Sequence, residues 1–233
     1  MKKSILILHG WGLSKKPYEK LTQLLTEKNF TVYSIDLPGF GSEPLMSHSM
    51  DLNDYVAFVH AFIKKNKLSP VIVIGHSFGG RVALKYAWKY PQNVSKVILS
   101  GVPVIRHMST FKKIAYLFSK SGGMILRIFP AQIQNVFKKL LYYSIGEWDY
   151  YKSNGLREVF KNIINEDVLQ YVKESKVPVI LVWGENDTVT PSSDVPTIKK
   201  QAKNVEYEIV PNTNHKLPYL YPEKFVKALE RHL

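Results

Sequence analysis

Short apolar segments alternate along this chain with stretches of helical periodicity. Runs rich in Val, Ile and Leu predict strands buried on both faces of a sheet, at residues 4–8, 71–74, 95–100 and 177–183. A further strand is predicted at 31–35, and the period-2 alternation of 205–210 is typical of a strand near a sheet edge. Apolar positions at helical spacing predict helices at 17–28, 51–65, 78–90, 194–203 and 222–233. This alternation predicts an α/β fold with a mostly parallel sheet of about six strands flanked by helices.

The pattern changes between residues 104 and 175, where the alternation of strands and helices stops. This segment is helical in pattern and basic, and it holds 12 of the 29 aromatic residues of the chain. We interpret residues 104–175 as a helical cap inserted into a core formed by 1–103 and 176–233. The apolar faces of such a cap are expected to close over a substrate pocket.

A strand and a helix meet almost without a loop at Gly75-x-Ser77-x-Gly79. So sharp a turn strains the central residue, and glycine on either side removes Cβ atoms that would collide with neighbouring backbone. The Ser77 hydroxyl is thereby held clear of the sheet. The first N–H of the helix, from Phe78, is expected to point at the same place, with the positive helix terminus behind it.

An acid and a histidine follow the last two predicted strands. Asp187 comes after the strand that ends at Trp183, and His215 comes after the strand that ends at 210. The carboxyl ends of parallel strands converge in one crevice, and a serine nucleophile needs a base oriented by an acid. The order Ser77, Asp187, His215 therefore predicts a catalytic triad, with Glu185 as the rival acid.

The first predicted strand runs into His9-Gly10-Trp11-Gly12, where two glycines let the backbone approach a ligand closely. The N–H of Trp11 is therefore a candidate second donor to an oxyanion, beside that of Phe78. His9 and His76 flank the site, and we assign both to structural roles, with His76 pointing away from Ser77.

Together with the loop at 36–42, these motifs resemble the α/β-hydrolase superfamily of esterases and lipases along essentially the whole chain. The resemblance implies a serine hydrolase that cleaves a carboxylic ester of a small, largely apolar substrate through an acyl-enzyme. It implies Ser77 as nucleophile, Asp187 as orienting acid and His215 as base, with the N–H groups of Trp11 and Phe78 as the oxyanion hole. One departure is Asn212, in the histidine loop, where many relatives have Gly.

Composition and net charge limit the cofactors and partners that we expect for this chain. The chain has no cysteine and no metal-ligand spacing such as His-Glu-x-x-His, so we expect neither a metal nor a cofactor. The formal net charge of +13 comes mostly from dispersed lysines, which predicts a solvated surface and no nucleic-acid partner. No apolar run approaches the roughly 18 residues of a membrane helix. We therefore expect a cytoplasmic monomer or homodimer that acts on a small molecule, without stable membrane insertion.

Two other functions stay open. Residues 79–84 are similar to a segment of the menaquinone-pathway lyase of this superfamily, which eliminates pyruvate from an acidic substrate. Arg81 suits such an anion, although it equally fits the surface of a helix. The other alternative is a hydrolase-like receptor that binds a small apolar ligand without turnover, and the complete set of Ser77, Asp187 and His215 weighs against it.

Overall fold

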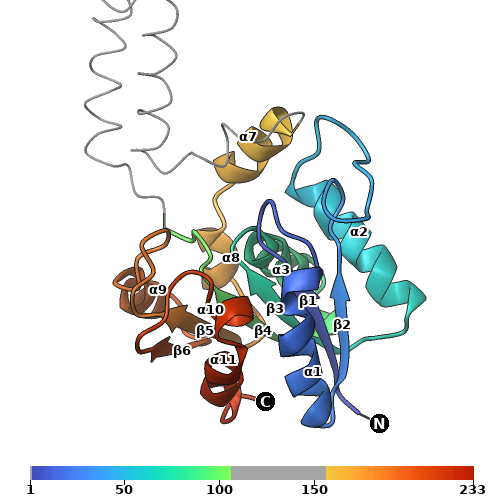
Figure 1. Ribbon diagram of the computed structural model, residues 1–233. Coiled ribbons are helices and arrows are strands. Elements are labelled where there is room, and N and C mark those ends of the chain that lie inside the picture. The colour runs from blue at the N-terminus through green and yellow to red at the C-terminus, as the bar shows by residue number, and fades with distance from the viewer. Residues whose placement is uncertain (1, 106–155) are drawn as a thin grey trace, which may run out of the picture.

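The computed structural model describes residues 2–105 and 156–233. These residues form a single parallel sheet flanked by helices (Figure 1). Its strand order is β2-β1-β3-β4-β5-β6, and every neighbouring pair is parallel. The strands are β1 (Ser4–Leu8), β2 (Thr31–Ile35), β3 (Val71–His76), β4 (Val94–Ser100), β5 (Val179–Gly184) and β6 (Val205–Val210). The predicted fold class is confirmed, including the edge position of β6.

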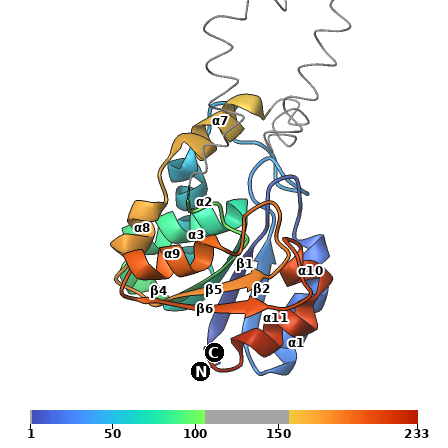
Figure 2. The ribbon, with the colours of Figure 1, turned by 90° about the vertical axis from the view of Figure 1, so that its left-hand side faces the viewer.

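Helices cover both faces of the sheet, and alternate strand residues divide between two cores. One face carries η1 (Lys16–Tyr18), α1 (Glu19–Glu27), α10 (Leu217–Leu220) and α11 (Pro222–Leu229). The other carries α2 (Leu52–Lys65), α3 (Phe78–Lys89), α8 (Leu169–Lys173) and α9 (Asp194–Gln201), as Figure 2 shows. The strands point the side chains of Ile5, Ile72 and Ile98 to the first face and those of Leu6, Val73 and Val97 to the second. Burial on both faces explains why these strands are continuously apolar.

Several element boundaries differ from the sequence prediction. β5 begins at Val179 and not at 177, because Pro178 has no N–H to donate, although its carbonyl accepts from Val97 at 2.9 Å. The closing helix ends at Leu229, and the short helix α10 was not expected. At the start of α2, Asp51 is the N-cap and forms a capping box with Asp54.

Most of the predicted cap, residues 106–155, lies outside the described part of the chain. The described remainder is helical, as expected: α7 (Arg157–Asn165) is followed by α8. α7 lies beyond the carboxyl ends of the strands, where the loops that carry the candidate site also lie (Figures 1 and 2). α8 packs against α3 and α9.

Candidate active site

Ser77 joins β3 directly to α3 in a strained conformation, with φ 50° and ψ −113°. Non-glycine residues rarely adopt such angles, at a cost of about 1–3 kcal/mol. The flanking glycines make the turn possible: a Cβ on Gly75 stands 2.5 Å from Cα of Gly80, and one on Gly79 stands 2.3 Å from the carbonyl oxygen of Leu8. The sharp turn that the motif predicts is therefore present.

Asp187 and His215 are in direct contact, although 28 positions separate them along the chain. Nδ1 of His215 lies 2.9 Å from Oδ2 of Asp187. The carboxylate also accepts from the Val189 N–H, the Thr190 N–H and the Thr190 hydroxyl, at 2.8–2.9 Å. Burial acts to raise the pKa of Asp187, but the hydrogen bonds from His215 and Thr190 outweigh it and lower the pKa below its usual range. An ionised Asp187 accepts the Nδ1 proton of His215 and leaves Nε2 as the basic nitrogen.

The register of the sheet brings Ser77 beside this pair. His76 and Ser100 are paired between β3 and β4, so Ser77 and Gly101 follow side by side at the ends of adjacent strands. The Ser77 N–H donates to the Ser100 carbonyl at 2.9 Å. The His215 ring stands over Gly101, where an added Cβ would lie 2.7 Å from its Cε1 and Nδ1 atoms. The three residues of the predicted triad thus gather at one end of the sheet.

Glu185, the other candidate for the acid of the triad, is exposed and has a structural role. Its carboxylate accepts the N–H of Asn212 at 3.0 Å and so braces the start of the histidine loop. Asn212 adopts φ 54°, a left-handed conformation that glycine favours and asparagine tolerates. Asparagine at this position therefore leaves the loop able to turn.

Trp11 lies next to the elbow and belongs to a cluster of aromatic rings. The chain turns from Gly10 to Leu13, whose N–H donates to the Gly10 carbonyl at 3.2 Å, and the Gly79 N–H ties α3 to the His9 carbonyl at 3.1 Å. The Trp11 ring packs edge-on against Phe40, Phe78 and Phe160 at 4.9–5.3 Å between centroids. Phe160 comes from α7, so this apolar cluster joins the elbow to the segment predicted as a cap.

The two flanking histidines are structural, as expected. Nε2 of His9 accepts the Leu37 N–H at 2.9 Å, which joins the loops after β1 and β2, and burial lowers the pKa of His9. His76 points toward the opposite face of the sheet, where it bonds to Tyr18 and to the backbone of His215. Sequence reasoning missed Tyr18 and Thr190, because only the fold brings them to these partners.

The structure supports neither role that the sequence left open for Arg81. The residue does not lie on the surface of the helix, and its guanidinium is bound by backbone carbonyls and not available to an anion. Its side chain is buried, and its guanidinium donates to the carbonyls of Pro103, Ile163 and Glu166. Lys85, one turn further along α3, forms an ion pair with the Glu166 carboxylate at 2.7 Å. Through these contacts, α3 binds the chain both before and after residues 106–155.

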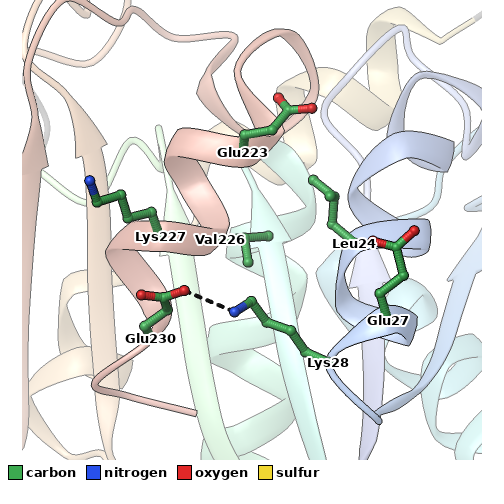
Figure 3. A pocket seen from close by; sticks show the side chains of 7 residues that line it. All are labelled: Leu24, Glu27, Lys28, Glu223, Val226, Lys227 and Glu230. Carbon is green, nitrogen blue, oxygen red and sulfur yellow. Dashed lines mark hydrogen bonds and ion pairs between the residues drawn. The ribbon is translucent and has the colours of Figure 1, made fainter.

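Two hollows lie away from Ser77. A groove of about 430 Å³ between α1 and α11 has mostly charged walls and is crossed by an ion pair between Lys28 and Glu230 (Figure 3). A second hollow of about 360 Å³ is bounded by the loop after β2 and by Leu156. The walls of the groove between α1 and α11 include neither serine nor histidine, and we do not assign it a reaction.

The described residues hold no group of three His, Cys, Asp or Glu side chains suited to a metal ion. Within the same ranges, no helix is both long and apolar enough to cross a membrane.

A parallel sheet with a serine elbow after its third strand, and with acid and histidine loops after later strands, defines the class of α/β-hydrolase folds. The chain belongs to the alpha/beta hydrolase fold family, which matches residues 3–127. It is similar to human monoacylglycerol lipase ABHD6, with 24% identity over 98% of this chain and 74% of that protein. It is also similar to the pimeloyl-[acyl-carrier protein] methyl ester esterase of Nitrosospira multiformis, with 25% identity over 97% of this chain and 93% of that protein.

Solved structures share the same fold. An esterase from Exiguobacterium antarcticum superposes with a TM-score of 0.74 at 21% identity, covering 99% of this chain and 91% of that one. A bromoperoxidase from Bacillus anthracis gives a TM-score of 0.73 at 19% identity, covering 98% of this chain and 91% of that one.

Proposed function

We propose that the protein is a serine hydrolase that cleaves a carboxylic ester of a small, largely apolar substrate. The observation that carries the proposal is the strained Ser77 beside a hydrogen-bonded Asp187–His215 pair. The names of relatives support it, since they include a monoacylglycerol lipase and a methyl ester esterase.

In the proposed reaction, Oγ of Ser77 attacks the ester carbonyl carbon while Nε2 of His215 takes the hydroxyl proton. Asp187 holds the ring in this tautomer and stabilises the imidazolium. The N–H groups of Phe78 and Trp11 donate to the oxyanion, and each such donor contributes on the order of 3 kcal/mol in comparable enzymes. The ester C–O bond breaks, His215 protonates the leaving alcohol, and an acyl-Ser77 remains. Water, deprotonated by His215, then attacks the acyl carbon, the bond from that carbon to Oγ of Ser77 breaks, and His215 returns the proton to Oγ as the acid is released.

The aromatic cluster around Trp11 supports an apolar acyl or alcohol group. Phe40, Phe78 and Phe160 bring rings from three separate elements to the side of the elbow. The same contacts support our division into a core, residues 1–103 and 176–233, and a cap, residues 104–175. In this proposal the substrate lies between the elbow and the cap.

The test combines active-site labelling with turnover. A fluorophosphonate probe with peptide mapping is expected to label Ser77, and a nitrophenyl ester series from acetate to decanoate is expected to show a chain-length optimum. Ser77→Ala is expected to abolish both. Ser95→Ala is the matched control, because Ser95 is exposed near the amino end of β4. Ester turnover that survives in Ser77→Ala, within a few-fold of the parent, refutes the mechanism.

The same experiment separates the alternatives. A lyase is supported by turnover of an acidic substrate in the absence of ester hydrolysis. A receptor is supported by saturable binding of an apolar ligand that persists in Ser77→Ala, with negligible hydrolysis by the parent protein.

A further inference from the structure

Three hydrogen bonds, two of them buried and the third partly buried, link the Trp11 turn to the backbone of His215. The Gly10 N–H donates to the Tyr18 hydroxyl oxygen at 3.2 Å. The Tyr18 oxygen lies 2.7 Å from Nδ1 of His76, and Nε2 of His76 lies 2.8 Å from the His215 carbonyl oxygen. Tyr18 and His76 are 0% and 2% exposed, so the two bonds to the Tyr18 hydroxyl are shielded from water.

The chemistry of the groups fixes the direction of every proton in this chain. The His215 carbonyl can only accept, so Nε2 of His76 carries a hydrogen. Nδ1 of a neutral His76 then accepts, and only the Tyr18 hydroxyl is placed to donate to it. Because the Tyr18 oxygen also accepts from Gly10, the three bonds form one ordered path from the turn after β1 to the loop after β6.

Burial keeps both side chains uncharged. Burial and the neighbouring His215 lower the pKa of His76 to about 3, and burial raises the pKa of Tyr18. The rings of His76 and His215 are 5.0 Å apart between centroids. A neutral His76 therefore places no charge against the imidazolium that forms on His215 during acyl transfer.

Tyr219 closes the cluster from α10. Its ring lies 5.5 Å from that of Tyr18 and 5.7 Å from that of His76, with contacts between rings alone. It therefore shares the packing of the cluster without belonging to the hydrogen-bonded path, and it provides a matched control.

We propose that Tyr18 and His76 are positioning residues, which hold the backbone of the base His215 in register with the Trp11 turn. The proposal rests on the function proposed above. In this arrangement the path fixes where Nε2 of His215 stands relative to the N–H of Trp11. A proton acceptor and an oxyanion donor, which belong to loops at opposite ends of the chain, are thereby set at a constant separation.

The test compares Tyr18→Phe with Tyr219→Phe, since each removes one hydroxyl from the same ring cluster. We expect Tyr18→Phe to lower kcat about ten- to hundredfold with little change in KM, because a shift of the base affects the chemical step more than substrate binding. Tyr219→Phe is expected to retain the parent kcat. Thermal unfolding of both variants separates lost activity from lost folding.

A double-mutant cycle adds a second measurement. His76→Asn shortens the side chain so that it cannot reach both partners, and the double variant Tyr18→Phe/His76→Asn is expected to lose no more kcat than the more impaired single variant. The ¹H resonance of the His215 Nδ1 proton, which does not depend on turnover, is expected to shift in Tyr18→Phe and to stay in place in Tyr219→Phe.

The outcomes are distinguishable. A parent protein that neither hydrolyses esters nor reacts with the fluorophosphonate refutes the proposed function, whereas the ¹H resonance still tests the positioning. Equal kcat in Tyr18→Phe and Tyr219→Phe, additive losses in the cycle, or an unmoved His215 resonance overturns the proposal for Tyr18 and His76.

Discussion

Gly101 follows β4 with φ +61°, directly beneath the ring of His215. A Cβ at this position lies 2.7 Å from both Cε1 and Nδ1 of His215, whereas ordinary contact begins at 3.4 Å. In Gly101→Ala the ring must therefore withdraw by about 0.7 Å, and a misplacement of about 1 Å costs roughly a hundredfold in rate. We expect kcat/KM for a reactive nitrophenyl ester to fall between about ten- and hundredfold.

The substitution also strains the backbone, and this part can be measured separately. An alanine in the left-handed region costs about 1–2 kcal/mol. Gly12→Ala provides the matched control for stability, because Gly12 has φ +71° and an added Cβ meets no atom within 4 Å. Urea unfolding of the two variants isolates the contact with His215 from the strain. If Gly101→Ala folds and keeps kcat/KM within about twofold of the parent, the ring is not held against Gly101 as we describe.

Three further predictions concern the side chains of Asp187, Arg81 and Asp36. Asp187→Asn removes the acceptor that sets the tautomer of His215, and we expect kcat to fall by about 10⁴, as in serine proteases, with KM little changed in steady-state assays. Arg81→Met leaves three carbonyls without their guanidinium donor, and urea unfolding is expected to show a loss of about 3 kcal/mol; an unchanged midpoint contradicts the structural role. Burial acts to raise the pKa of Asp36, but two backbone N–H groups and a hydroxyl lower it below its ordinary value. The stabilisation from Asp36 is therefore complete above about pH 4 and is lost as the pH falls through the lower folded-state value. Thermal unfolding across this range is expected to show a flatter pH dependence in Asp36→Asn than in the parent.

The sheet could be predicted from sequence, and the members of the proposed triad could be selected from it, because each leaves a local signal. Strands buried on both faces are continuously apolar, whereas the edge strand β6 alternates apolar and polar residues and buries only Val205 and Val210. The sharp turn at Ser77 is recognisable from the glycines at fixed spacing on either side of it. Asp187 and His215 follow from chain order, since parallel strands bring their carboxyl ends together.

The hydrogen-bond partners of the remaining residues could not be found in this way, because they lie far along the chain. Tyr18 and His76 are 58 positions apart, and Arg81 reaches carbonyls 22 to 85 positions away. A basic residue on an amphipathic helix usually faces solvent, and the sequence has no signal for the carbonyls that need a donor. Thr190 likewise resembles an ordinary turn residue until Asp187 is seen to accept its hydroxyl.

Arg81 has a consequence for how this protein can change over evolutionary time. Its guanidinium fastens Pro103, before residues 106–155, to Ile163 and Glu166, after them, so α3 itself supplies closure at that point. With the ends fastened, doubling the length of an intervening loop costs only about 0.6 kcal/mol of closure entropy. We therefore expect insertions, deletions and exchanges between residues 106 and 155 to change the stability of the sheet little. The segment between Pro103 and Ile163 can therefore be exchanged while the Ser77 elbow stays as it is.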